Sequence, residues 1–348
     1  MNGKKKTMRA VIEIIIAVLV IIAVYFIIRG MDRHDVRIRQ AATENEMQRV
    51  WKEFQEKPVS IKLHKKNWKF AHPVQTYLFI GTDKSGNEDA EGEEYHGSMV
   101  DALMLVVVDE EEKAYGILQL NRDTITEVPM LLQDGSANAS AQMQLCTAHW
   151  YGKDKAASCD NTVETVSKML GGLPIDGYYA LKMDAMPLLN HEVGGVTVTL
   201  EDDMTKLDPA MKKGATLTLT DRQAELLMQS RYAMDDDRNT QRMRRQQIFL
   251  NAFMKKIKKQ NAGDIDAAVK LYDRLRPYAT TDIKMNDLTA LLKDMQGYTD
   301  KGIITIDGTS KIGEKLHDGK KHWEFYMDED SLETSMKQLY LLVQEKGK

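Results

Sequence analysis

The apolar residues of this 348-residue chain fall into short runs separated by charged or glycine-containing segments. Three runs follow one another closely, at residues 76–81, 101–109 and 114–120. The second run is apolar at consecutive positions, which is typical of a central strand that helices cover on both faces. The EEEK turn at 110–113 predicts a hairpin between the second and third strands, so the sheet is expected to be mixed.

Helix signals alternate with further strands along the rest of the chain. Thr220 and Gln223 form a capping box, a reciprocal side-chain and backbone pairing, before a short helix that ends near Arg231. Asn161 and Glu164 give the same pattern before a helix that stops at a glycine pair. We therefore predict an α/β fold with a central mixed sheet. Further strands are expected at 177–183, 194–200 and 303–306, and helices at 162–170, 239–259, 264–296 and 331–343.

The N-terminal segment differs from the rest of the chain. Residues 11–28 are apolar apart from Glu13 and follow the basic stretch MNGKKKTMR. As a helix this segment would rise about 27 Å, close to the thickness of a bilayer core. The basic cluster predicts a cytoplasmic N-terminus, with everything after Arg29 outside. A cleaved signal peptide is the alternative, but the long apolar stretch and the lack of a small-residue cleavage site favour an uncleaved transmembrane anchor.

The chain is long enough for two average domains or for one large α/β domain. We expect residues 1–30 to form a cytoplasmic tail and anchor, and the charged residues 31–72, which contain few strand formers, to form a stalk. Residues 73–348 are then the folded extracytoplasmic domain. We expect residues 300–348 to complete that domain rather than to cap it separately.

The overall charge excludes one class of partner. With 48 Lys and Arg against 52 Asp and Glu, the net charge is −4. The chain has no global basic field, so nucleic-acid binding is not expected and any anion site must be local.

The two cysteines, Cys146 and Cys159, would both lie outside the membrane in this topology. An oxidising compartment permits a disulfide between them, and two unpaired buried thiols are the alternative.

The ends of the predicted strands bring charged residues together. If Asp109 lies opposite Ala114 in the hairpin, then Asp101 lies opposite Arg122. Asp83 follows the first strand, and its loop must return to Asp101, so it can reach the same sheet edge. An ordinary salt bridge at a strand end is the alternative to a binding site.

The long predicted helix carries arginines on the same face as its phenylalanines, which mark the core side. Unpaired buried charge is costly, and arginines at a helix start oppose the helix dipole, so a bound anion would relieve both effects. Arg231 and Arg238 precede this helix and could converge on the same phosphate-rich ligand. A solvated helix end paired with acidic residues 235–237 is the alternative. The shared face consists of Arg242, Arg245, Gln246, Phe249 and Phe253.

Together these groups suggest a pyrophosphate held by arginines, with Mg²⁺ between Asp83, Asp101 and the phosphate oxygens. Magnesium usually binds through one or two carboxylates plus substrate phosphates, so no dedicated cage is required.

The motifs, in this order, resemble those of the LytR-CpsA-Psr family of membrane-anchored bacterial envelope proteins. They are GTD, D-A-L-M-L, N-R-D-T, G-x-P-I-D-x-Y, G-G-V-x-V and R-x-x-R-Q, and the likeness covers roughly residues 74–260. The resemblance implies a three-layer α-β-α domain whose hydrophobic pocket takes a polyprenyl chain. It also implies transfer of a glycopolymer from an undecaprenyl-pyrophosphate carrier onto peptidoglycan, as a phosphodiester to a muramic acid hydroxyl.

The resemblance assigns roles to individual residues. Arg122 and Asp123 match the family's R-D-T and would be catalytic, and Arg231 matches the second arginine of its R-x-R. In-line attack by the sugar hydroxyl would expel polyprenyl phosphate, with Asp123 or Asp101 taking the proton. The implied Mg²⁺ ligands are Asp83 and Asp101, and the implied pyrophosphate-binding residues are Arg122, Arg231, Arg242, Arg245 and Gln246. Arg238 is predicted to join them from its position just before the helix.

Three positions depart from the family pattern. Met99 and Gln229 stand where the family has arginines, and Asn239 stands where it has an acidic residue. These departures favour the alternative of an envelope assembly protein that binds polyprenyl phosphate without turning it over. A transcription-regulating role is disfavoured, because the expected single-pass topology at the cell membrane keeps the domain away from DNA.

Overall fold

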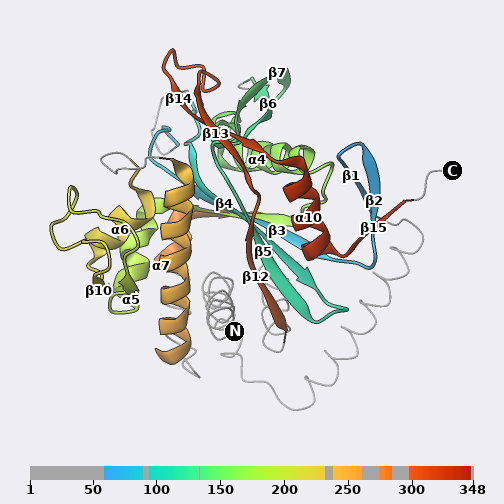
Figure 1. Cartoon of the computed structure of the whole chain (residues 1–348). Coiled ribbons are helices and arrows are strands. Elements are labelled where there is room, and N and C mark those ends of the chain that lie inside the picture. Colours follow the sequence, from blue (N-terminus) through green and yellow to red (C-terminus); the bar gives the residue numbers. More distant parts are fainter. Residues whose placement is uncertain are drawn as a thin grey trace, which may run out of the picture.

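A six-stranded mixed sheet organises the chain, and Figure 1 shows helices beside it. The computed structural model describes residues 59–88, 94–132, 134–231, 238–260, 274–283 and 298–345. Within the sheet, three neighbouring pairs are antiparallel and two are parallel, so the predicted α/β fold with a central mixed sheet is confirmed. The strand order is β11 (Ala279–Thr281), β8 (Gly177–Lys182), β3 (Gln75–Thr82), β4 (Val100–Asp109), β5 (Ala114–Leu120) and β12 (Thr299–Thr305).

The β4–β5 hairpin has the predicted register. Asp109 lies opposite Ala114, and Leu103 lies opposite Leu120. Successive β4 side chains enter opposite cores, since Met104 packs in one buried cluster and Leu105 in the other. The absence of a polar face on this strand in the sequence therefore reflects burial on both sides.

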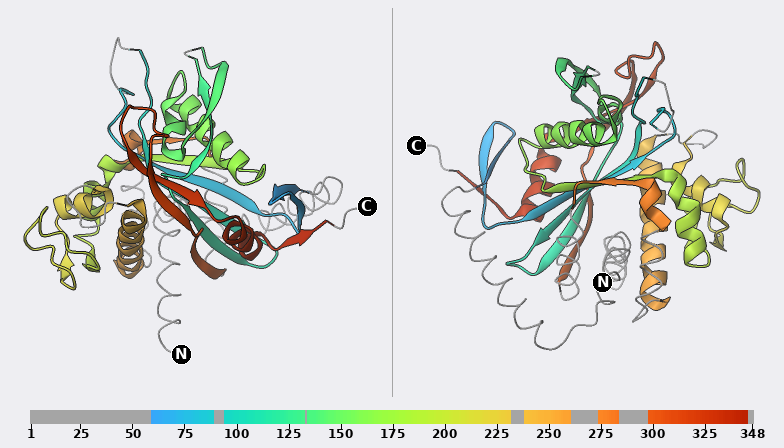
Figure 2. Two further views of the ribbon diagram at one scale, coloured as in Figure 1. Left: turned by 45° about the horizontal axis from the view of Figure 1, so that its top comes forward. Right: turned by 180° about the vertical axis from the view of Figure 1, so that it is seen from behind.

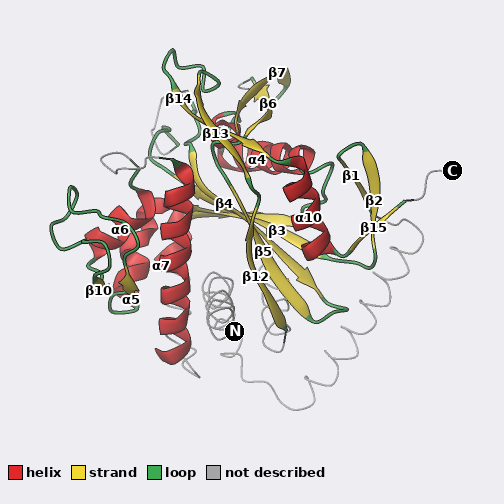
Figure 3. Cartoon of the chain, in the orientation of Figure 1, coloured by secondary structure: helices red, strands yellow, loops and turns green. Residues whose placement is uncertain are grey.

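Helices cover both faces of the sheet, as Figures 2 and 3 show. One core contains Phe249 and Phe253 of the long helix, and the other contains Val166 and Met336 from two different helices. On the first face lie α5 (Met186–Glu192), α6 (Asp221–Gln229) and α7 (Asn239–Gln260), and on the second lie α4 (Lys155–Met169) and α10 (Glu329–Tyr340).

Four small sheets surround this body. Two of them are hairpins near one end of the central sheet, β6 (Ile125–Leu131) with β7 (Ala137–Gln144), and β13 (Gly308–Gly313) with β14 (His322–Met327). A third pairs β9 (Thr197–Thr199) with β10 (Thr216–Thr218), so the strand predicted at 194–200 is shorter than expected. The fourth consists of β1 (Ser60–Leu63), β2 (Lys66–Phe70) and β15 (Leu342–Gln344).

The prediction that residues 60–70 belong to a stalk was wrong. They form β1 and β2, whose alternate residues Ile61, Leu63, Trp68 and Phe70 are buried. Four exposed lysines, Lys62, Lys65, Lys66 and Lys69, lie among these buried residues and obscured the period-two pattern. The folded part of the chain therefore begins no later than Ser60.

Three helix predictions also need correction. Helix α4 begins at Lys155, because Asp154 rather than Asn161 caps it by accepting from Ala157 N at 2.9 Å. The last helix ends at Tyr340, and the residues after it pair with β2. Residues 279–281, predicted as helical, form β11 against β8, while 264–273 and 284–296 lie outside the described residues.

The predicted anchor and most of the stalk, residues 1–58, also lie outside the described residues. Among the helices of the described ranges, none is both long enough and apolar enough to cross a bilayer.

Candidate active site

Asp101 is the centre of a buried charged cluster at the end of the β4–β5 hairpin. Arg122, just beyond β5, donates from Nη1 to Asp101 Oδ1 at 2.7 Å. Arg242, in the first turn of α7, donates from Nη1 to the same oxygen at 2.6 Å. All three side chains are buried, so β4, the segment after β5 and α7 meet at one carboxylate.

Asp123 joins a third arginine to this cluster. Arg231 Nη1 donates to Asp123 Oδ1 at 3.1 Å, and Arg231 Nη2 forms an ion pair with Oδ2 at 2.9 Å. Arg122 Nε lies 3.7 Å from Asp123 Oδ1 on the other side. Three guanidiniums thus share two carboxylates, Asp101 and Asp123.

The electrostatics of the cluster favour an added anion. Burial alone would raise the pKa of Asp101, but Arg242 and Arg122 outweigh it and hold that pKa below its usual range. Burial lowers the pKa of Arg242 to about 10; Asp101 opposes this shift, while repulsion from Arg122 and Arg231 adds to it. A phosphate group facing these arginines would replace repulsion by charge-assisted hydrogen bonds.

Asn239 orients Arg242. Its Oδ1 accepts from Arg242 Nε at 3.0 Å and Nη2 at 2.6 Å, and its Nδ2 donates to Asn121 Oδ1 at 2.9 Å. Asparagine can thus hold the guanidinium as a carboxylate would, without neutralising it.

Met99 and Gln229 occupy the other two departing positions. Arg122 Nη2 lies 2.8 Å from Met99 Sδ, and Gln229 Nε2 donates to Met183 O at 3.2 Å. Met99 and Gln229 are both uncharged. The site therefore has fewer arginines than the family pattern would give.

The remaining predicted anion ligands lie elsewhere. Arg245 is 2.8 Å from Asp202 and also donates to the backbone of Ser230, so it ties α7 to the end of α6. Gln246 donates to the Met228 carbonyl at 3.2 Å, and Arg238 is exposed just before α7.

A cavity of about 720 Å³ faces the cluster, within the usual size of ligand pockets. Of the predicted site residues, its wall includes Asp83, Asp101, Arg122, Arg231 and Arg242, but not Asp123, Arg238, Arg245 or Gln246.

The sequence did not indicate the rest of the cavity lining, here called the second wall. That wall comes from the end of β7, from α6 and from the loop between β13 and β14. Its polar side chains come from three segments that are far apart in the sequence and follow no motif, and the charged loop 314–321 resembles an ordinary surface turn. The polar side chains of this wall are Gln144, Arg222, Glu225, Asp318, Lys320 and His322.

Asp83 and Asp101 offer a donor set suited to a substrate-bound metal. Asp83 Oδ1 accepts from Ser85 N at 2.9 Å, Ser85 Oγ at 2.6 Å and Met99 N at 3.0 Å, whereas Oδ2 has no donor within the described part of the chain. No group of three or more His, Cys, Asp or Glu side chains in the described ranges could hold a metal alone. Two carboxylates that line one cavity still fit Mg²⁺, because phosphate oxygens usually complete its ligands.

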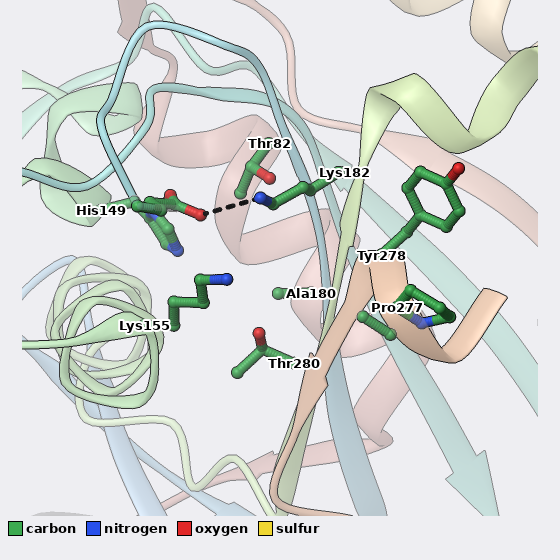
Figure 4. A pocket seen from close by; sticks show the side chains of 10 residues that line it. Thr82, His149, Lys155, Ala180, Lys182, Pro277, Tyr278 and Thr280 are labelled. Atoms are coloured by element: carbon green, nitrogen blue, oxygen red, sulfur yellow. Dashed lines mark ion pairs between the residues drawn. The ribbon is translucent and has the colours of Figure 1, made fainter. Parts of the chain in front are cut away.

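The cysteines are free and buried, so the structure has the unpaired thiols rather than the disulfide. Cys159 Sγ lies 3.6 Å from His149 Nε2, beside the small cavity of about 20 Å³ that Figure 4 shows. Lys155 and Lys182 also line this cavity, and Lys182 Nζ is 3.9 Å from Glu88 Oε2. The cavity has room for about one water molecule and not for a substrate.

Comparisons with known proteins identify the family. Bacillus subtilis TagV matches with a TM-score of 0.56 and 24% identity, over 76% of this chain and 95% of that chain. Streptococcus agalactiae gbs0355 gives a TM-score of 0.60 and 19% identity over 79% and 90% of the two chains. TagT bound to LI-WTA gives 0.52 and 19% over 76% and 89%. A search of curated proteins found no match. Since the family model described as LytR_cpsA_psr matches residues 36–340, the chain belongs to the LytR-CpsA-Psr family.

Proposed function

We propose that this protein is a membrane-anchored transferase. It moves a glycopolymer from a polyprenyl-pyrophosphate carrier to the cell wall as a phosphodiester. The observation that carries the proposal is the buried Asp101, which holds Arg122 and Arg242 on the wall of one large cavity. Membership of the family and the match to a TagT bound to LI-WTA support a glycopolymer as the substrate.

In this proposal the pyrophosphate lies against Arg122, Arg231 and Arg242, whose guanidiniums suit bidentate binding of phosphate oxygens. Arg245 and Gln246 keep α7 in place behind them, and Arg238 lies at the exposed start of the helix. Asp83 and Asp101 would hold Mg²⁺, which supplies Lewis-acid stabilisation of phosphoryl charge when bound.

The reaction is an in-line displacement at the sugar-linked phosphorus. A bond forms between the acceptor hydroxyl oxygen and this phosphorus, while the bond from phosphorus to the oxygen of the leaving polyprenyl phosphate breaks. The arginines stabilise the charge that develops on the phosphoryl oxygens and on the leaving group. Asp123, fixed between Arg122 and Arg231, positions both guanidiniums.

The proposed location is the cell membrane, with residues 11–28 as a single span and the domain outside. The acceptor is then peptidoglycan, and nucleic acid is not a partner. A reporter enzyme fused after Lys348 tests the topology, because activity found only in the cytoplasm would exclude this location.

The direct test of the site is mass spectrometry of lipid that co-purifies with the detergent-extracted protein. We expect wild-type protein to retain a polyprenyl pyrophosphate, and the Arg122→Ala, Arg242→Ala double variant to retain at least about tenfold less, since hydrogen bonds to charged groups are strong. Arg244→Ala is the matched control, since Arg244 lies on α7 with its side chain 60% exposed. Adding Asp101→Asn to the double variant avoids leaving that carboxylate buried without a partner.

A non-catalytic carrier-binding protein is the second candidate, favoured by the uncharged Met99 and Gln229. Turnover of a labelled lipid-pyrophosphate sugar, measured with and without Mg²⁺, separates the two. Lipid retention without transfer in either condition would support the second candidate.

A further inference from the structure

The proposed transfer needs a group that takes the proton of the attacking hydroxyl, and the cationic wall does not offer one. Asp101 Oδ1 accepts from two guanidiniums, Arg122 at 2.7 Å and Arg242 at 2.6 Å. Asp123 has Arg231 against both of its oxygens and does not line the cavity. A general base needs a free lone pair and access to the substrate, and in the proposed function Asp83 and Asp101 are the Mg²⁺ ligands. The second wall is therefore the place to look.

A histidine and a carboxylate lie together in that second wall. His322 Nε2 lies 3.0 Å from both oxygens of Asp318, and both residues line the cavity. Their side chains are 25% and 34% exposed, so solutes can reach them. A carboxylate that accepts from Nε2 fixes the tautomer in which Nδ1 keeps its lone pair. Within the residues that the structure describes, Nδ1 of His322 has no partner.

Strand β14 fixes this pair relative to the arginines. Phe325 N donates to Asp123 O at 2.8 Å, and Gln144 Nε2 donates to Trp323 O at 2.5 Å. His322 is three residues before Phe325, which corresponds to about 10 Å along a strand. The histidine therefore belongs to the same rigid unit as the segment that carries Arg122.

The loop between β13 and β14 is also held in place. Glu324 is buried and accepts from Lys315 N at 2.8 Å, and Leu316 is buried against the second core. Lys320 N donates to Asp318 Oδ1 at 3.0 Å, which orients that carboxylate toward the histidine. The loop is thus anchored at both sides of the Asp318–His322 pair.

The other charges around the cavity leave this pair available. Lys320 is the remaining charged side chain of the loop that lines the cavity. From α6, Arg222 and Glu225 face the same cavity and pair with each other at 2.7 Å. Asp83, Asp101 and the three arginines line the same cavity.

We propose that His322, oriented by Asp318, is the catalytic base for the acceptor hydroxyl, an inference that rests on the proposed function. The hydroxyl proton moves to His322 Nδ1 as the oxygen forms its bond to phosphorus. The electron pair of the broken bond leaves with the polyprenyl phosphate oxygen. The imidazolium that forms is stabilised by Asp318.

The test compares His322→Gln with His191→Gln in the full-length protein. His191 is the matched control, because it pairs with Asp221 at 3.2 Å in an exposed position outside the cavity. We expect His322→Gln to lower kcat for transfer about 100-fold or more while polyprenyl-pyrophosphate retention stays at the wild-type level. The acid limb that a general base gives to the pH–rate profile should disappear in His322→Gln. His191→Gln should match wild type.

A second variant keeps the test independent of folding. Added imidazole should restore part of the transfer rate of His322→Ala, and Asp318→Asn should keep transfer but move the acid limb. A wild-type rate and pH profile in His322→Gln would overturn the base assignment and leave the proposed function standing. Loss of lipid retention in His322→Gln would also overturn it, by indicating a structural role. If wild type retains lipid but transfers nothing under any condition, both proposals fall.

Discussion

Arg122 and Arg242, from two parts of the chain, both donate to Oδ1 of Asp101. The carboxylate therefore compensates their positive charge and holds the two guanidiniums in place. Removing one partner of a buried ion pair typically costs about 3–5 kcal/mol, because the remaining charge stays buried without compensation. Replacing Asp101 would leave two such charges, Arg122 and Arg242. Its substitution should therefore affect stability as well as binding.

For Asp101→Asn we expect the free energy of unfolding to fall by about 3–5 kcal/mol at neutral pH. Since the two arginines hold the pKa of Asp101 below its usual range, the carboxylate stabilises the fold fully above about pH 4. This contribution is lost as the pH falls through the lower folded-state pKa. Urea unfolding followed by circular dichroism should show the gap between wild type and variant narrowing below about pH 4. A gap of constant size down to about pH 2 would contradict the assignment.

At the scale of single residues, the sequence predicts which side chains meet across a hairpin and which share one face of a helix. The pairing of Asp101 with Arg122 follows from the hairpin register, and the inward direction of Arg242 follows from the helix stripe. The stripe could not distinguish Arg242, which faces the cavity, from Arg245, which Asp202 neutralises. The partner of an inward arginine depends on which other element packs there, and spacing along one helix does not contain that information.

The helix α6 links the two walls of the cavity, since Arg222 and Glu225 lie on it and Arg231 follows it. Its N-terminus has the predicted capping box, with Gln223 N donating to Thr220 Oγ1 at 3.2 Å and Thr220 N donating to Gln223 Oε1 at 3.0 Å. The cap fixes where the helix begins. It thereby sets the rotation of the residues that face the cavity.

Thr220→Ala should lower the free energy of unfolding by about 1 kcal/mol, because a backbone N–H loses its acceptor. Thr220→Asp is the control, since aspartate is an equally good N-cap and should leave stability near the wild-type value. Thermal unfolding of the three proteins measures the difference. Equal destabilisation by alanine and aspartate would show that the cap does not contribute through this hydrogen bond.

The elements that the sequence missed share a cause. Strands β1 and β2 have buried residues at alternate positions, but lysines fill the intervening ones. Inside α4, Asn161 looked like a cap, yet its Nδ2 donates to the carbonyls of Pro129 and Ala148 at 3.1 and 2.7 Å. In both cases the buried side depends on which other element packs there, and the local pattern alone could not reveal it.

The whole described molecule depends on its C-terminal segment. Strand β12 pairs in parallel with β5, and Met336, Leu339 and Tyr340 of α10 are buried in the second core. Residues 299–340 thus share the sheet and the core with the preceding part of the chain.

Leu339→Ala should lower the free energy of unfolding by about 2–5 kcal/mol, since it opens a cavity in that shared core. Val343→Ala, at a residue 58% exposed, should change it by less than about 0.5 kcal/mol. Near-ultraviolet and far-ultraviolet circular dichroism should follow one coincident transition in both variants. Two separate transitions in Leu339→Ala would indicate that the C-terminal segment forms a separate cap.

The hydrogen bond between Phe325 of β14 and the backbone of Asp123 joins two segments that the ribosome makes at different times. The ribosome makes the arginine-bearing segment early and His322 near the end of the chain. A nascent polypeptide therefore has the charges that attract a phosphate before it has the strand that completes the cavity. A polypeptide that ends before His322 lacks β14 and the residues that the β13–β14 loop adds to the cavity lining, so we expect it to lack the proposed catalytic base.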